Sequence, residues 1–394
     1  MKRFALWGIV VGLGMTPLGL AQAAQAPNPQ RQAALALEQQ GRNAEAEAAW
    51  RDYLKDHATS AEAYAHLGLL EARQEHYREA VPLYRKALAM GPDVAGLRLN
   101  LGLALFKDGA LKEAVQEFSG LRKSEPDNQQ LNTLIGMAYY GLAEYKLAVP
   151  FLKEAAARDA ASLPLRLALA HSCLWSKQNQ CVLDVYKEIL ALDPDSAEAD
   201  MLAGEALDEM KDNEGSTKMF RAAVKANPKE PNAHFGLGYL LWTQKQYPEA
   251  ASEFEAELAN DPDHVQSRLY LADTEIQMNR MEDARPPLER VEKQNPGIAL
   301  DHLDLGIVYT EAGRTKDALR ELLAAEKLMP DDVNVHWRLG RLYRILGKPG
   351  EAKAEFDKAG KLNKAADEDL YKKIAAGAAR PAPAQTPPAP AAEK

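Results

Sequence analysis

Small residues recur along this chain every 34 residues. Counting Ala61 as position one of the second repeat, position eight is Gly or Ala in ten consecutive repeats. These residues are Ala34, Gly68, Gly102, Gly136, Ala170, Gly204, Gly238, Ala272, Gly306 and Gly340. The spacing holds without insertion over residues 27–366. A fixed period of this length predicts stacked copies of one supersecondary unit.

Large apolar residues keep the same period at position twenty-four. They are Trp50, Tyr84, Phe118, Leu152, Tyr186, Phe220, Phe254, Leu288, Leu322 and Phe356, and position twenty is Ala in most repeats. Small residues at positions eight and twenty would let two antiparallel helices approach closely, with the bulky residue filling the space beside their crossing. Each repeat is therefore predicted to be a helical hairpin.

Proline marks the end of most repeats. Position thirty-two is Pro92, Pro126, Pro194, Pro228, Pro262, Pro296 and Pro330 in seven of them. Proline cannot continue a helix, so the second helix should stop there and the next hairpin begin. Pro286 and Pro287 fall inside the second helix of the eighth repeat, and we expect that helix to start late.

This pattern, with Leu-Gly at positions seven and eight, Ala at twenty, Phe or Tyr at twenty-four and Pro at thirty-two, resembles the tetratricopeptide signature. The resemblance implies an all-α protein, a right-handed superhelical solenoid of about ten 34-residue helix-turn-helix repeats. It is specific for fold and unspecific for function.

The repeats divide the chain into five expected parts. Residues 1–23 are a signal peptide, 24–60 a degenerate N-terminal repeat or cap, and 61–366 the array, with repeats starting at 61, 95, 129, 163, 197, 231, 265, 299 and 333. Residues 367–376 keep apolar residues at helical spacing, which predicts a C-terminal capping helix. Residues 377–394 are rich in Ala and Pro, as in disordered tails.

The signal peptide predicts export. Lys2 and Arg3 precede an apolar run and then the small residues of Ala21-Gln22-Ala23, after which we expect cleavage. The mature chain would then be soluble in the periplasm or outside the cell. Cleavage would remove two basic and no acidic residues, so the net charge would fall from −9 to −11. Such an acidic chain is a poor partner for nucleic acid.

The array leaves no room for a catalytic domain. We therefore predict no enzyme, no cofactor and no metal ion. His234, His302 and His336 all fall at position four, where they are interpreted as packing residues. The two cysteines, Cys173 and Cys181, could form a disulfide in an oxidising compartment or could be two small packing residues. Their spacing leaves both readings open.

Binding would fall to the concave surface, which in the family is lined by the first helix of each hairpin. At those positions stand Leu103, Phe106, Met137, Tyr140, His171, Trp175, Phe235, Tyr239, Trp242, Arg338 and Arg341. Two interpretations stay open: the apolar stripe packs neighbouring hairpins together, or it forms a groove for a partner segment with aromatic anchors. The groove predicts that Trp242→Ala with Tyr239→Ala weakens partner capture without unfolding the array.

The sequence thus favours a scaffold or adaptor of the bacterial cell envelope that binds peptide or helical segments of partner proteins. A periplasmic chaperone-like holder of client proteins is one alternative. An accessory arm of polysaccharide-export or glycan-processing machinery is another, since aromatic side chains also stack on sugars.

Overall fold

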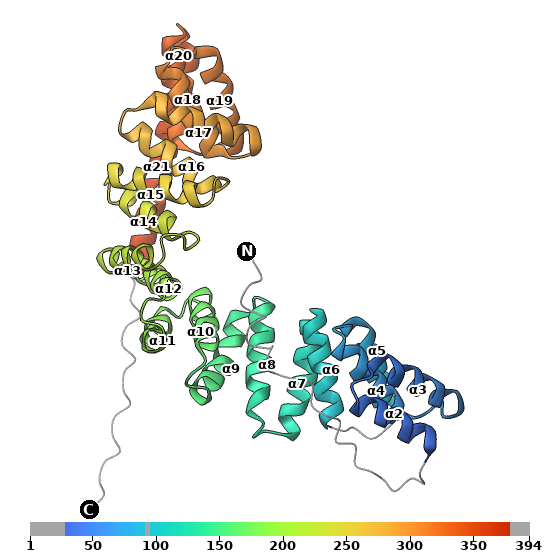
Figure 1. Cartoon of the computed structure of the whole chain (residues 1–394). Helices are drawn as coiled ribbons and strands as arrows, with labels where there is room; N and C mark the ends of the chain where they lie inside the picture. The colour runs from blue at the N-terminus through green and yellow to red at the C-terminus, as the bar shows by residue number, and fades with distance from the viewer. Residues whose placement is uncertain (1–27, 91–94, 379–394) are drawn as a thin grey trace, which may run out of the picture. The chain divides into compact units, whose positions relative to one another are not determined.

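The computed structural model describes residues 28–90 and 95–378, with side chains as far as residue 365. Over these ranges the chain forms twenty helices, paired into ten hairpins, and no strand (Figure 1). The chain divides into two compact units, Met1–Pro228 and Lys229–Lys394, called here the N-terminal and C-terminal units. The all-α repeat fold predicted from the 34-residue period is confirmed.

The N-terminal unit holds hairpins one to six. Their helices are α2 (Pro29–Gln39), α3 (Asn43–Asp56), α4 (Ala61–Arg73), α5 (Tyr77–Met90), α6 (Ala95–Asp108), α7 (Leu111–Ser124), α8 (Gln129–Gly141), α9 (Tyr145–Arg158), α10 (Leu163–Trp175), α11 (Asn179–Leu192), α12 (Ala197–Glu209) and α13 (Asn213–Ala226).

The C-terminal unit holds hairpins seven to ten. Their helices are α14 (Ala233–Thr243), α15 (Tyr247–Asn260), α16 (Val265–Gln277), α17 (Met281–Gln294), α18 (Ala299–Glu311), α19 (Thr315–Leu328), α20 (Val333–Ile345) and α21 (Pro349–Ala378). Every second helix in both units begins at position seventeen of its repeat, and the first helices begin at position one except in hairpins one and seven.

The late start of α14 has a visible cause. Asn232 takes a left-handed conformation with φ 68° directly before the helix. The buried carboxylate of Glu257 then accepts hydrogen bonds from the backbone N–H groups of Asn232, at 3.0 Å, and Phe235, at 3.2 Å. A carboxylate at this end of a helix satisfies N–H groups that have no partner within the helix.

The glycines at position eight are explained by the large side chain, most often an aromatic ring, at position twenty-four. A Cβ added to Gly102 would lie 2.5 Å from Cε1 of Phe118, and one added to Gly340 would lie 2.7 Å from Cε1 of Phe356. Both distances are far below a van der Waals contact. Only a residue without a side chain lets the two helices of these hairpins approach so closely.

The expectation of a late start for α17 is wrong. The helix begins at Met281, at position seventeen like the other second helices, and both Pro286 and Pro287 lie inside it. Proline also occurs inside α5 at Pro82 and inside α9 at Pro150, at the same repeat position as Pro286. Each proline removes one hydrogen bond of the helix, and burial of the opposite, apolar face offsets that cost.

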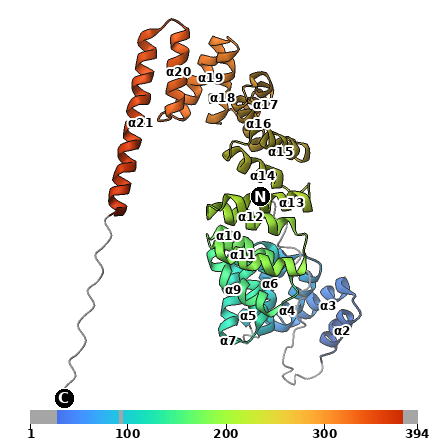
Figure 2. The same cartoon turned by 90° about the vertical axis from the view of Figure 1, so that its left-hand side faces the viewer.

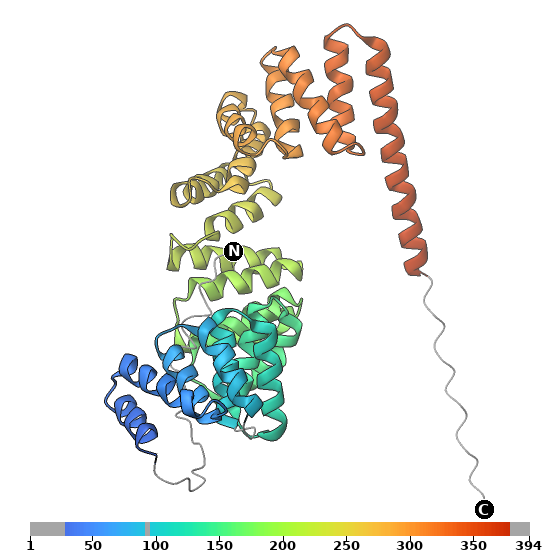
Figure 3. The same ribbon diagram turned by 90° about the vertical axis from the view of Figure 1, so that its right-hand side faces the viewer.

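The C-terminal end differs from the predicted separate capping helix. Residues 367–376 are helical, but they continue α21, which runs without a break from Pro349 to Ala378 (Figures 2 and 3). The predicted signal peptide at 1–23 and the Ala/Pro-rich tail from 379 onward lie outside the described residues.

Position four connects a hairpin to the loop before it. In α18 the Nε2 atom of His302 lies 3.0 Å from the carbonyl oxygen of Pro296, and in α20 the Nε2 atom of His336 lies 2.7 Å from that of Pro330. These carbonyls lie in the loops just beyond the second helices α17 and α19, where the hydrogen bonding of the helix has ended. The side chains of His302 and His336 are buried, as packing residues are.

Each unit has its own hydrophobic core. In the N-terminal unit a cluster extends from Ala65 to Ala206, with a smaller cluster around Trp50 in its first hairpins. In the C-terminal unit a cluster extends from Leu269 to Leu342. Within residues 28–90 and 95–378, no helix combines the length and the apolar character that crossing a membrane requires.

Candidate partner-binding site

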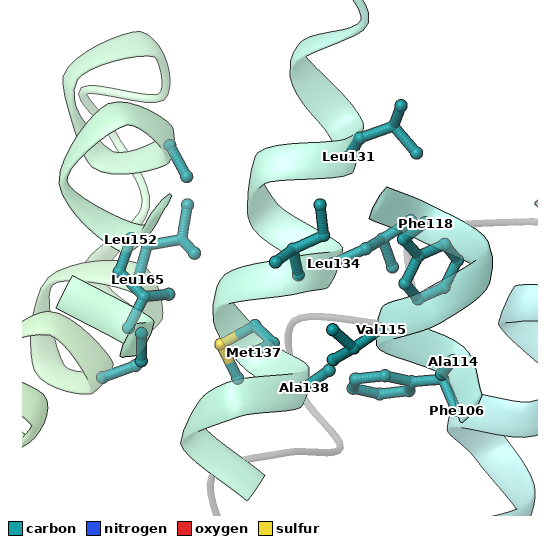
Figure 4. Packing of buried hydrophobic residues seen from close by; sticks show 14 of the residues in the cluster. Phe106, Ala114, Val115, Phe118, Leu131, Leu134, Met137, Ala138, Leu152 and Leu165 are labelled. Carbon is teal, nitrogen blue, oxygen red and sulfur yellow. The ribbon is translucent and has the colours of Figure 1, made fainter. Parts of the chain in front are cut away.

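Part of the predicted groove belongs to the hydrophobic core. Leu103, Phe106 and Met137 are buried, and Figure 4 shows Phe106 and Met137 among the packed side chains of α6 to α8. First helices contact one another in this unit, as α8 and α10 do, and these three side chains belong to the hydrophobic cluster that runs through its hairpins. The prediction that the three residues contact a partner is therefore corrected, because they hold neighbouring hairpins together.

Other residues of the predicted groove are accessible to solvent at the edge of hairpins four and five. Trp175, the last residue of α10, is 50% exposed, and Tyr140 and His171 are half-buried. Two side chains of α9, Tyr145 and Leu147, complete this surface. These five residues are called here the Trp175 patch.

Contacts between aromatic rings join four of the five residues of the Trp175 patch. The ring centroids of Tyr145 and Trp175 lie 5.6 Å apart, those of Tyr140 and Tyr145 5.9 Å, and those of Tyr140 and His171 6.3 Å. These separations are typical of favourable aromatic pairs. These contacts hold the rings in place, while Trp175 remains half-exposed.

The patch borders a hollow of about 320 Å³. Its lining includes Tyr145, Leu147, Trp175 and Ser176, together with the turn before α9. Leu147 is itself 46% exposed. Exposed Trp and Leu around a hollow are costly to keep in water and are typical of surfaces that a partner covers.

The backbone around the patch is firmly held. Cys173 of α10 and Cys181 of α11 form a disulfide, with their Cα atoms 5.8 Å apart. The hydroxyl of Ser176 donates a hydrogen bond to the carbonyl oxygen of Ser172 at 2.6 Å. The disulfide closes the turn that follows Trp175, so this side chain stands on a braced hairpin end.

The five residues of the Trp175 patch include no carboxylate and no ammonium group. Burial, with help from the neighbouring Tyr145 and Glu198, raises the pKa of Tyr140 to about 12, so its hydroxyl stays protonated at physiological pH. The Nε2 atom of His171 lies 2.8 Å from Oε1 of Glu198, across the boundary to the next hairpin. This carboxylate brings negative charge to the edge of the patch.

A second hollow in the N-terminal unit is a weaker candidate. It has about 350 Å³ and lies over α7, α8 and α9. Its aromatic residue, Phe151, is half-buried, and the guanidinium of Arg122 lies 5.1 Å from the centre of its ring. The ring already has a partner within the chain.

The C-terminal unit has a more enclosed aromatic cluster. Phe235, Tyr239 and Trp242 of α14 meet Tyr270 of α16, at centroid distances of 5.9, 5.4 and 5.2 Å. All four are half-buried, and the fully buried Phe254 packs against both Phe235 and Tyr270. The predicted residues Phe235, Tyr239 and Trp242 thus come together, but much of their surface packs within the chain.

Charged groups lie next to this cluster. The indole N–H of Trp242 donates a hydrogen bond to Asp273 Oδ2 at 2.6 Å. Asp304 is buried, and one of its carboxylate oxygens has no hydrogen-bond partner within the described residues. Burial, followed by the negative charges of Asp273 and Asp301, raises the pKa of Asp304 well above its usual range.

The predicted arginines lie on α20. Arg338 and Arg341 are half-buried, and both guanidinium groups lie over the ring of Trp337, at 5.4 and 5.1 Å from its centre. Burial and the neighbouring charge of Arg341 lower the pKa of Arg338. The structure therefore adds an exposed tryptophan to the two predicted cations.

Several of these residues were not among the sequence candidates. Trp337 stands at position five and Tyr270 at position six, both among the positions that the family resemblance marks as lining the concave face. A complete reading of those positions would have found them. Tyr145 and Leu147 lie on a second helix, and no repeat position indicates that they border a hollow.

Comparison with known proteins gives one family. Models of the tetratricopeptide repeat match residues 67–128, 209–264 and 303–366, and a second model of the same repeat matches residues 241–303. Together these ranges include more than half of the chain.

Curated relatives share the repeat region over part of their length. The chain is 26% identical to anaphase-promoting complex subunit 3 of Schizosaccharomyces pombe over 41% of this chain and 24% of that protein. It is 23% identical to the TPR repeat-containing protein YpiA of Bacillus subtilis, over 50% of this chain and 49% of that one. The chain spans between about a quarter and a half of the length of these relatives.

Solved structures show the same kind of architecture at low identity. YrrB, described as a TPR protein with an unusual peptide-binding site, is 17% identical with a TM-score of 0.41, over 48% of this chain and 97% of that one. A TPR repeat-containing protein of Cytophaga hutchinsonii is 14% identical with a TM-score of 0.49, over 61% and 98%. Neither likeness bears on function.

Proposed function

Because the chain belongs to the tetratricopeptide repeat family, whose members generally mediate protein–protein interaction, we propose that it is a scaffold or adaptor of the bacterial cell envelope. It binds a peptide or helical segment of a partner protein, and the Trp175 patch provides the anchor. It does not catalyse a reaction. A repeat fold of this kind is typical of non-enzymatic proteins.

The observation that carries this proposal is the half-exposed Trp175 beside a hollow of about 320 Å³. Elsewhere in the N-terminal unit, Trp50, Tyr84 and Phe118 at position twenty-four are fully buried. A tryptophan on a braced turn loses little conformational freedom when a partner covers it. The patch therefore suits an apolar or aromatic side chain of a partner.

The charges around the patch refine the partner's chemistry. Glu144 and Lys146 line the hollow with opposite charges, and Glu198 stands at the edge of the patch next to His171. A partner segment with one apolar anchor and a flanking Lys or Arg would complement this arrangement.

A signal-peptide pattern in the sequence supports the envelope as the location. The basic start, the apolar run and the Ala21-Gln22-Ala23 sequence are typical of a signal peptide, and a disulfide is suited to an oxidising compartment. A further curated relative is the human protein named protein O-mannosyl-transferase TMTC1, but the match covers 25% of that protein at 24% identity. Catalysis is not part of the proposal.

Selection of peptides from a random display library on the purified mature chain tests the proposal. We expect one consensus with an apolar anchor, and at least about a tenfold loss of affinity in Trp175→Ala combined with Tyr145→Ala. Leu192→Ala, which truncates another exposed apolar residue of the same unit, is the matched control and should bind normally.

The alternatives give different results in the same experiment. Enrichment of many unrelated apolar peptides would support a chaperone-like holder of clients instead. Binding of envelope polysaccharide without any peptide consensus would support an accessory arm of glycan machinery. Equal binding by the double variant and the wild type would reject the Trp175 patch.

A further inference from the structure

Three side chains with metal-binding atoms meet in the C-terminal unit, each from a different helix. They are Glu326 of α19, His336 of α20 and Glu355 of α21, and one ligand atom of each lies within 4.8 Å of the other two. The Nδ1 atom of His336 is 2.6 Å from Glu355 Oε2 and 3.8 Å from Glu326 Oε1. Among the described residues, no other group of three or more His, Cys, Asp or Glu side chains converges in this way.

The imidazole of His336 is oriented as in a metal site. Its side chain is only 3% exposed, and its Nε2 atom lies 2.7 Å from the carbonyl oxygen of Pro330. Without a metal, Nδ1–H donates to Glu355 and Nε2–H donates to the carbonyl; an entering metal ion would displace the Nδ1 proton and take the lone pair that then faces the two carboxylates. Histidines that bind metal usually donate their other N–H to a carbonyl or carboxylate in this manner.

The cluster already attracts a cation from the chain itself. The ammonium of Lys358 lies 2.9 Å from Glu326 Oε1 and 2.8 Å from Glu355 Oε1. Its side chain is 49% exposed and flexible, so the ammonium can move into solvent without disturbing the helices. The two carboxylates and the imidazole would remain in place for another cation.

Hairpin nine provides an internal comparison. His302 occupies the same repeat position, with its Nδ1 atom 2.7 Å from Glu321 Oε2 and its Nε2 atom 3.0 Å from the Pro296 carbonyl oxygen. There, Arg320 holds the other oxygen of Glu321 at 2.7 Å, and no third ligand joins the pair. A His–Glu pair is therefore enough for packing in this repeat. Glu292 stands at the repeat position of Glu326, but among the described residues its carboxylate does not converge on His302 and Glu321 as that of Glu326 does on His336 and Glu355.

We propose that Glu326, His336 and Glu355 bind a divalent transition-metal ion, with Zn²⁺ as the best match, and that Lys358 withdraws when the ion enters. One imidazole nitrogen and two carboxylate oxygens are common zinc ligands, and water would complete a tetrahedron. The ion would join α19, α20 and α21 and so fasten the last hairpin to the one before it. This site is independent of the proposed function in the N-terminal unit.

Zinc titration of the untagged mature chain, stripped of metal and competed against a chromophoric chelator, tests the site. We expect one equivalent of Zn²⁺ to bind, with a loss of at least about tenfold in affinity for His336→Gln and for Glu326→Gln. His302→Gln is the matched control and should retain the wild-type affinity. Glu326→Gln alters a partly exposed side chain, so it tests the site even if the buried His336→Gln variant misfolds.

Lys358→Met separates a metal site from an ion-pair network. If the ammonium competes with the metal, its removal should raise the zinc affinity severalfold, since two carboxylates lose their internal partner. A lower zinc affinity in Lys358→Met, no stoichiometric zinc in the wild type, or equal losses in His302→Gln and His336→Gln would each overturn the proposal.

Discussion

The two units consist of the same kind of hairpin, but different side chains are buried at equivalent positions. In hairpin four of the N-terminal unit, positions three and six are Leu131 and Leu134, both fully buried (Figure 4). In hairpin nine of the C-terminal unit the same positions are Asp301 and Asp304, which are also buried. The 34-residue geometry thus fixes which positions are inside, and it tolerates either leucine or a carboxyl group at those positions.

The difference in chemistry makes the stability of hairpin nine depend on pH. Burial raises the pKa of Asp301 to about 7, against the opposing effect of the nearby His302. Neither carboxylate oxygen of Asp301 has a hydrogen-bond partner within the described residues. The leucines of hairpin four do not titrate, so the comparison predicts a pH-dependent C-terminal unit beside a pH-independent hairpin four.

The largest expected effect on stability lies in the N-terminal unit. Phe118→Ala should lower the free energy of unfolding of the N-terminal unit by about 3–5 kcal/mol, because it empties a fully buried site between α6 and α7. Urea unfolding followed by segment-resolved hydrogen exchange measures this loss. The loss should be the same at pH 5 and pH 8.

Gly102→Ala is the control for the packing explanation. Alone it should cost about 1–3 kcal/mol, because its Cβ would collide with the Phe118 ring. In the Phe118→Ala background the ring is gone, so the added cost should nearly vanish. Simple additivity of the two changes would show that the glycine is small for another reason.

A smaller effect is expected from pH in the C-terminal unit. In an unfolded chain, Asp ionises near pH 3.9. The folded unit keeps the proton on Asp301 up to about pH 7, so it binds more protons than the unfolded chain between these values. The free energy of unfolding must therefore fall as the pH rises through this window.

His302 changes stability in the same direction. Burial lowers its pKa, but the contacts with Glu321 and with the Pro296 carbonyl outweigh burial and raise it above its usual value. Its contribution to stability is then complete below about pH 6.5 and is lost as the pH rises through the higher, folded value. Hydrogen exchange in α18, corrected for its intrinsic pH dependence, should become faster relative to α8 at pH 8.

Asp301→Asn sharpens this prediction. Asparagine cannot ionise, so at pH 8 the variant should be more stable than the wild type by about 1–2 kcal/mol, after allowance for screening by nearby charges and water. At about pH 3, where the unfolded chain also keeps most of its protons, the two should be nearly equal. Asp263→Asn, at a site that is 79% exposed, is the control and should change nothing. A variant that is less stable than the wild type at pH 8 would contradict the assigned burial effect.

The repeat pattern predicted the fold well because sterics at a few positions decide it. The residues at positions eight and twenty-four meet at each helix crossing, as Gly102 and Phe118 do, and their sizes can be read directly from the sequence. The helix boundaries followed for the same reason. The late start predicted for α17 from Pro286 and Pro287 was wrong, because packing of the opposite face of the helix outweighs one or two lost hydrogen bonds.

The surface was harder to predict because it depends on contacts between hairpins. Met137 and Trp175 both lie on first helices at positions assigned to the groove, yet one is fully buried and the other is half-exposed. How closely successive first helices pack decides this, and that spacing is not encoded at a single position. The charged interior of the C-terminal unit was missed likewise, since Asp301 in a helix would ordinarily face solvent.

Site-specific photo-crosslinking in the producing cells tests most directly that the Trp175 patch holds a partner. A photoreactive amino acid at Leu147, which borders the hollow, should give one discrete covalent adduct, and the same residue at Leu192 should not. Trp175→Ala should abolish the Leu147 adduct while the chain remains folded. Equal crosslinking from both sites, or an adduct that persists without Trp175, would contradict the account.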